Sequence, residues 1–110
     1  MKLPQNGMLL RIFIGETDNY QGKPLYEQIV LKAKELHLAG ATVIRGIMGF
    51  GAASRIHTAK ILRLSEDLPI VIEIIDEESK IFQLMPFLDE TVKDGLITME
   101  SVKIIKYRTK

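Results

Sequence analysis

The chain has 110 residues, of which 46% are hydrophobic and 26% charged, and its formal net charge is +1. This length fits one soluble globular domain, residues 1–110, and leaves no room for a separate catalytic module. The absence of cysteine excludes disulfides, thiol nucleophiles and cysteine-based metal centres. Basic residues are scattered rather than clustered, which argues against nucleic acid as a partner. No apolar run is long enough to span a membrane, so we expect a cytoplasmic protein.

The first half of the chain predicts a strand, a helix and a second strand. Residues 8–14 are typical of a central strand with one charge, and residues 16–23 of a polar loop. Pro24 suits the first turn of a helix that Gly40 ends. Residues 41–48 predict the second strand. The apolar face of the helix consists of Leu25, Ile29, Ala33 and Leu36.

The second half predicts a loop, a strand, a helix and a last strand. Residues 52–68 fit neither period, so we expect a long loop with some local structure. Residues 69–75 form a buried strand, and residues 76–79 start a helix that Pro86 should kink or split. Residues 97–107 form the last strand. The order βαββαβ predicts an α+β, ferredoxin-like fold, a four-stranded antiparallel sheet with two helices on one face. We expect other subunits to cover the remaining face.

The glycine-rich stretch of residues 46–51 is the most informative local feature. Glycine lets a ligand approach the backbone closely, so that N–H groups can bind phosphate oxygens. The alternative is that these glycines only form a bulge and a turn between two strands. No Gly-Lys-Ser or Gly-Lys-Thr follows, so the sequence does not predict a nucleotide-hydrolysing P-loop.

Two cations near the C-terminus are the second candidate. On a strand, Lys106 and Arg108 emerge on the same face, roughly 7 Å apart. That spacing suits a diphosphate or triphosphate chain. The alternative is a solvated, charged chain end.

Several other charged residues leave their roles open. Arg55 and His57 lie in the middle loop, where a side chain is usually solvated. Glu73 stands inside an apolar strand and either faces the interior of an assembly or pairs with a neighbouring lysine. Glu16 and Asp18 either bind a cation or hold a loop amide. Neither histidine has a partner at triad or metal-ligand spacing and no Gly-x-Ser-x-Gly elbow is present, so we expect no enzyme.

Five short motifs resemble those of the PII signalling proteins and their PII-like relatives, in particular a branch classed as a domain of unknown function. They stand in the same order and at nearly the same distances over residues 8–109. The motifs are Gly40-Ala41-Thr42-Val43, Gly49-Phe50-Gly51, His57-Thr58, Leu68-Pro69 and Lys106-Tyr107-Arg108-Thr109.

The resemblance implies a homotrimer that binds an adenine nucleotide in clefts between subunits. It also implies that the loop of residues 50–65, with Arg55, His57 and Thr58, contacts a target protein. Thr42 would lie against the adenine, while Lys106 and Arg108 would meet phosphates. The residues implied in nucleotide binding are Thr42, Gly49, Phe50, Gly51, Lys106 and Arg108.

The chain departs from the PII pattern at three places. Leu96 stands where PII carries a phosphate-binding lysine, which makes ADP or AMP a better ligand than ATP. The segment between Val43 and Gly49 is one residue longer, which suggests a bulge near Arg45-Gly46. Residues 52–68 contain no tyrosine, so the tyrosyl modification of some PII proteins cannot occur there.

Two other functions stay open from the sequence. One is a structural or divalent-cation-binding trimer of the same architecture, which would use Glu16, Asp18 or His57. The other is a small enzyme working at subunit interfaces, with Glu73 or His57 as the base. The abundance of isoleucine, lysine and glutamate also favours a heat-adapted, thermostable protein.

Overall fold

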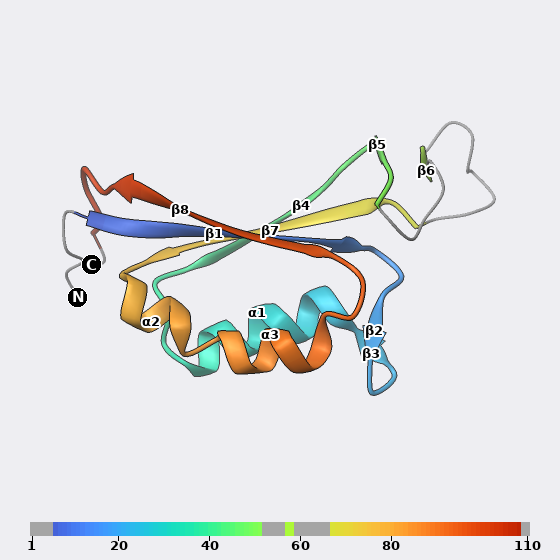
Figure 1. The fold of residues 1–110 in the computed structure, drawn as a ribbon, viewed down its shortest axis with the longest axis horizontal. Helices are drawn as coiled ribbons and strands as arrows, with labels where there is room; N and C mark the ends of the chain where they lie inside the picture. The colour runs from blue at the N-terminus through green and yellow to red at the C-terminus, as the bar shows by residue number, and fades with distance from the viewer. Residues whose placement is uncertain (1–5, 52–56, 59–66, 109–110) are drawn as a thin grey trace.

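The computed structural model describes residues 6–51, 57–58 and 67–108. A four-stranded antiparallel sheet with the strand order β4-β7-β1-β8 forms one layer of the molecule. Both helical segments cover the same face of this sheet (Figure 1). The predicted βαββαβ order and ferredoxin-like fold are therefore confirmed. The strands are β1 (Asn6–Gly15), β4 (Ala41–Arg45), β7 (Pro69–Asp76) and β8 (Leu96–Lys103).

The helical layer consists of α1 (Leu25–Glu35) and a second segment in two pieces, α2 (Glu78–Phe82) and α3 (Met85–Thr91). Pro86 stands in the first turn of α3, where its missing N–H leaves no intrahelical hydrogen bond unmade. The predicted splitting of this helix is thus confirmed.

The core lies between the sheet and the helices. Every second residue of β1 and β7 points to the helices, because side chains alternate across a strand. The fully buried residues of this layer have less than 2% of their surface exposed, as expected for apolar side chains packed between two layers. They are Leu10, Ile12, Ile29, Ile72, Ile74, Ile81, Leu84 and Leu88.

The first helix ends earlier than predicted. His37, and not Gly40, adopts the left-handed conformation after the last turn, with φ of 62°. The N–H of His37 donates to the carbonyl of Lys34, and the N–H of Leu38 donates to that of Ala33. These two bonds form a Schellman motif. They let Leu38, which is buried, turn back into the core.

Residues 16–23, predicted as a loop, contain a short hairpin of β2 (Asn19–Tyr20) and β3 (Lys23–Pro24). Its turn residues Gln21 and Gly22 both have positive φ, as the type I′ turn of a two-residue hairpin requires. Pro24 therefore precedes α1 as its N-cap rather than lying in its first turn.

Two predicted strands are shorter than expected. The second strand, predicted over residues 41–48, ends at Arg45, and residues Met48–Gly49 form a separate strand β5 that pairs with β6 (His57–Thr58). β6 is the local structure expected within residues 52–68, most of which lie outside the described residues. The last strand ends at Lys103 and not at Tyr107.

Candidate functional site

The face of the sheet opposite the helices is uncovered in the described part of the chain (Figure 1). Four apolar residues, one on each strand, form a row across this face, because each lies opposite the next in the sheet register. Of this row, Phe13 has 36%, Ile44 47% and Leu96 57% of its surface exposed. The row consists of Ile44, Val71, Phe13 and Leu96.

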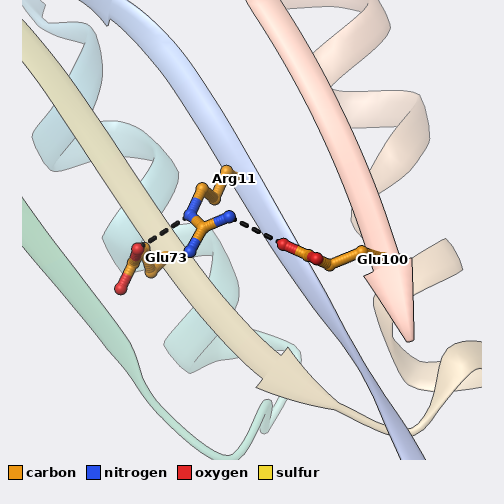
Figure 2. A network of polar contacts seen from close by, with 3 residues as sticks. All are labelled: Arg11, Glu73 and Glu100. Carbon is orange, nitrogen blue, oxygen red and sulfur yellow. Dashed lines mark hydrogen bonds and ion pairs between the residues drawn. The ribbon is translucent and has the colours of Figure 1, made fainter. Parts of the chain in front are cut away.

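An ion network occupies the middle of this uncovered face (Figure 2). The Arg11 guanidinium on β1 contacts Glu73 on β7 through Nε, at 2.9 Å, and Glu100 on β8 through Nη1, at 2.7 Å. The hydrogen bond to Glu73, followed by the coulombic attraction of both carboxylates, raises the pKa of Arg11 above its usual value. Glu73 thus pairs with an arginine rather than with a lysine, which was one of the two alternatives that the sequence left open. Two carboxylates and one guanidinium leave this network with one net negative charge.

Thr42, the predicted adenine contact, lies beside this network. It is exposed and stands opposite Glu73 in the register of β4 and β7, while Glu73 stands opposite Arg11. Since directly opposite residues point to the same side of a sheet, Thr42 belongs to the uncovered face.

The glycine-rich stretch forms a corner that packs on Pro69. The N–H of Gly46 donates to the Pro69 carbonyl at 2.8 Å. A Cβ atom on Gly46 would lie 2.8 Å from Cγ of Pro69, and one on Gly49 would lie 3.0 Å from it. The glycines thus have a packing role, which supports the bulge-and-turn interpretation without testing the nucleotide role. Phe50, with 71% of its surface exposed, extends from this corner.

Residues just after the end of β1 contact chain segments that precede and follow residues 52–66. The N–H of Glu16 donates to the Leu68 carbonyl at 2.8 Å, and the Glu16 carboxylate pairs with Arg45 Nη1 at 2.7 Å. The N–H of Thr17 donates to the Asp67 carboxylate. The Asp18 carboxylate accepts the N–H of Gly15, so it holds a loop amide.

These contacts bear on the cation-binding alternative. Glu16 and Asp18 are both engaged within the chain, by a guanidinium and by an amide. Across residues 6–51, 57–58 and 67–108, histidine, aspartate and glutamate form no group of three that could hold a metal ion.

The chain beyond β8 crosses the opposite end of the sheet. Ile104 lies against Gly7, where a Cβ atom would come within 2.7 Å of its Cδ1. The Tyr107 hydroxyl donates to the carbonyl of Ala39 at 3.0 Å. The N–H of Ala39 in turn donates to the buried Asp76 carboxylate at 2.9 Å. The segment therefore runs from β8, at one edge of the sheet, to the start of β4 at the other.

Lys106 and Arg108 lie in this segment and are exposed. The prediction that they share one face of a strand is wrong, because the strand ends at Lys103. They stand on either side of Tyr107, whose hydroxyl fixes the segment beside the start of β4. Both cations therefore flank the residue that contacts Ala39, which precedes Thr42 by three positions in the chain.

The six predicted nucleotide-binding residues form two groups in one chain. Thr42, Lys106 and Arg108 lie at the end of the sheet where β4 starts, whereas Gly49, Phe50 and Gly51 lie beyond the other end of β4. Figure 1 shows the C-terminal end of β8 and the short strand β5 at opposite ends of the sheet. Of the predicted partner-loop residues, His57 and Thr58 pair through β6 with Gly49 and Met48, while Arg55 lies outside the described residues.

In the described part of the chain, no helix is long and apolar enough to cross a bilayer. Solved structures with the same fold include a PII-like signalling protein from Thermus thermophilus, with a TM-score of 0.64 and 19% identity, over 91% of this chain and 90% of that one. Another is CPII, a nitrogen regulatory PII-like protein from Thiomonas intermedia K12, in a complex with ADP, AMP and bicarbonate. It has a TM-score of 0.64 and 13% identity, over 92% of this chain and 90% of that one.

Similar sequences give the family. A UPF0166 protein of Aquifex aeolicus (strain VF5) is 46% identical over 88% of this chain and 91% of its own length. The UPF0166 protein of Methanocaldococcus jannaschii is 35% identical over 92% of this chain and 94% of its own. The DUF190 family model (Uncharacterized ACR) matches residues 7–104. The chain thus belongs to the DUF190 family, and its fold is that of the PII-like proteins which its five motifs resemble.

Proposed function

We propose that this protein is a non-catalytic regulator that binds an adenine nucleotide in clefts between the subunits of a homotrimer. ADP or AMP is the preferred ligand over ATP. The loop of residues 50–65, with Arg55, His57 and Thr58, passes the signal to a target protein.

The observation that carries this proposal is the separation of the two groups of candidate residues. β4 alone spans five residues, or about 13 Å at strand rise, and the glycine corner and the C-terminal cations lie beyond its two ends. A nucleotide that contacts both groups therefore needs the corner of one copy beside the C-terminal segment of the next. This separation supports a ligand site between subunits.

The uncovered face supplies a surface for such an assembly. Its row of Ile44, Val71, Phe13 and Leu96 would lose contact with water when another copy packs on it, and each Å² of apolar surface buried contributes about 25 cal/mol. Contiguous exposed apolar surface of this kind marks interaction sites. Thr42 lies on the same face, so the proposed adenine contact lies at the proposed interface.

The ligand class has its own support. The fold neighbour CPII is bound to ADP, AMP and bicarbonate. In this chain Leu96, with 57% of its surface exposed, stands where PII has a phosphate-binding lysine. A site with fewer cations favours a ligand with fewer phosphates, which is why ADP or AMP is proposed.

Calorimetry and thermal unfolding with ATP, ADP, AMP and adenosine test the proposal. A ligand that binds only the folded protein raises the melting temperature. Arg108→Ala should weaken ADP binding about tenfold or more, the worth of a charge-assisted hydrogen bond, and leave adenosine unchanged. Lys34→Ala, which removes an exposed cation on α1, is the matched control and should change neither.

Three results would contradict the proposal. The first is an absence of binding by any of the four ligands. The second is an equal loss of ADP and adenosine affinity in Arg108→Ala, which would exclude a phosphate contact. The third is a shift in melting temperature with divalent metal ions and none with nucleotides, which would support the cation-binding trimer instead.

A further inference from the structure

Arg45 is the last residue of β4 and directly precedes the glycine corner. Its side chain has 60% of its surface exposed, and its Nη1 lies 2.7 Å from Oε2 of Glu16. The backbone at this point is held in place, because the N–H of Gly46 donates to the Pro69 carbonyl. Arg45 therefore presents an exposed cation from a fixed position at the start of the glycine corner.

The same end of the sheet lacks a cation at the position that the family resemblance assigns to phosphate binding. Leu96 occupies it, at the first position of β8. Lys93 is the nearest cation before β8 in the sequence, and it lies with Asp18 and Asp94 around a small hollow rather than at the glycine corner. Among the residues that the structure describes, Arg45 is thus the arginine that directly precedes the corner.

Glu16 holds Arg45 through one charged contact. The Glu16 carboxylate has 22% of its surface exposed and is positioned by its own N–H, which donates to the Leu68 carbonyl. Guanidinium has five N–H donors and binds carboxylate and phosphate oxygens with the same geometry. A terminal phosphate carries more negative charge than one carboxylate and so attracts the same guanidinium more strongly.

We propose that Arg45 binds the terminal phosphate of the nucleotide at the glycine corner, and that Glu16 is the internal carboxylate which the phosphate replaces. The inference rests on the proposed nucleotide-binding function and adds to it a phosphate-binding residue and a competing group. Arg45, on β4, then provides the positive charge that Leu96 does not provide. Binding then breaks the side-chain contact between the ends of β4 and β1.

Two substitutions with opposite effects test this inference by calorimetry with ADP, AMP and adenosine. Arg45→Ala should weaken ADP binding about tenfold or more, because a charge-assisted hydrogen bond is lost. Glu16→Gln should strengthen ADP binding by up to about fivefold, because the exposed ion pair with Arg45 would no longer compete with the phosphate. Adenosine, which has no phosphate, should bind all proteins equally.

Lys93→Ala is the matched control, since it removes the same charge from an exposed lysine near the start of β8. It should leave the affinity for ADP within about twofold of that of the unsubstituted protein, which is the effect expected of removing one surface charge. Arg45→Gln, which keeps a polar side chain, repeats the test if Arg45→Ala does not fold. Circular dichroism and gel filtration establish that each variant is folded.

The outcomes separate this inference from the proposed function. If the unsubstituted protein binds ADP and Arg45→Ala binds it equally well, Arg45 is not a phosphate ligand, and the proposed function stands. If Glu16→Gln weakens ADP binding as much as Arg45→Ala does, Glu16 positions Arg45 instead of competing, and the exchange is wrong. If neither the unsubstituted protein nor any of the variants binds ADP, both the inference and the proposed function fail.

Discussion

At the scale of single residues, Tyr20 shows how a contact between distant segments changes an ionisation. Its hydroxyl donates to the Glu90 carboxylate, and its ring packs edge-on against Phe87 at a centroid distance of 6.0 Å. The hydrogen bond to Glu90, followed by desolvation, raises the pKa of Tyr20 above 10.0. This contact attaches the hairpin of β2 and β3 to α3.

The raised pKa of Tyr20 predicts a pH dependence. Because the folded-state pKa lies above the unfolded value, the contact stabilises the fold fully below about pH 10, the pKa of free tyrosine, and is lost as pH rises through the folded value. Ultraviolet titration of the phenolates should show a step for Tyr20 above the usual tyrosine range. Tyr20→Phe should remove that step, and Glu90→Gln should lower it. A step that stays unchanged in Glu90→Gln would contradict the assigned cause.

The sequence indicated some of the residues that form the two ion pairs, but not their partners. Arg11 and Glu73 are each the single charge within an apolar strand, which signals a partner across the sheet, but the sequence does not say which strands are neighbours. Glu100 is 89 residues from Arg11 and joins the pair only through the β1–β8 register. The pairing of Arg45 with Glu16 carried no signal, because Arg45 ends β4 and Glu16 lies in the loop after β1.

At the scale of elements, the corner between β4 and β5 depends on close packing against Pro69. Gly46→Ala should lower the free energy of unfolding by about 1–3 kcal/mol, the cost of overpacking, because the new Cβ would lie 2.8 Å from Pro69 Cγ. Gly40→Ala is the control, since nothing lies within 4 Å of a Cβ there. Urea unfolding at equal protein concentrations measures both. An equal effect of the two substitutions would exclude the packing role of Gly46.

Element boundaries show where local signals are sufficient. Pro86 splits the second helical segment as predicted, because a missing N–H and a fixed φ act within one turn. The end of the first helix is different. Gly40 is the residue with the usual preference for a helix stop, but His37 takes the left-handed conformation. The burial of Leu38 decides this, and burial depends on the sheet that the helix covers.

At the scale of the whole molecule, the uncovered face predicts the oligomeric state. Ile44→Glu should raise the concentration at which the proposed trimer dissociates by about tenfold or more, because a carboxylate would be buried without a partner. Leu31→Glu, at a residue of α1 with 59% of its surface exposed against 47% for Ile44, is the matched control and should leave assembly unchanged. Analytical ultracentrifugation measures both. Dissociation in both variants, or in neither, would contradict an interface on this face.

The βαββαβ order and the family motifs could be predicted from the amino-acid sequence, because they depend on neighbours within a few residues. The alternation of buried and exposed positions along β7 could not, because the sequence of this strand is apolar almost throughout. The end of the last strand at Lys103 could not, since the chain beyond it leaves the edge of the sheet and contacts Gly7 and Ala39 instead. The same holds for the placement of the candidate binding residues at opposite ends of one sheet. Strand register and segment crossing are set by contacts between residues far apart in the chain, such as that of Tyr107 with Ala39.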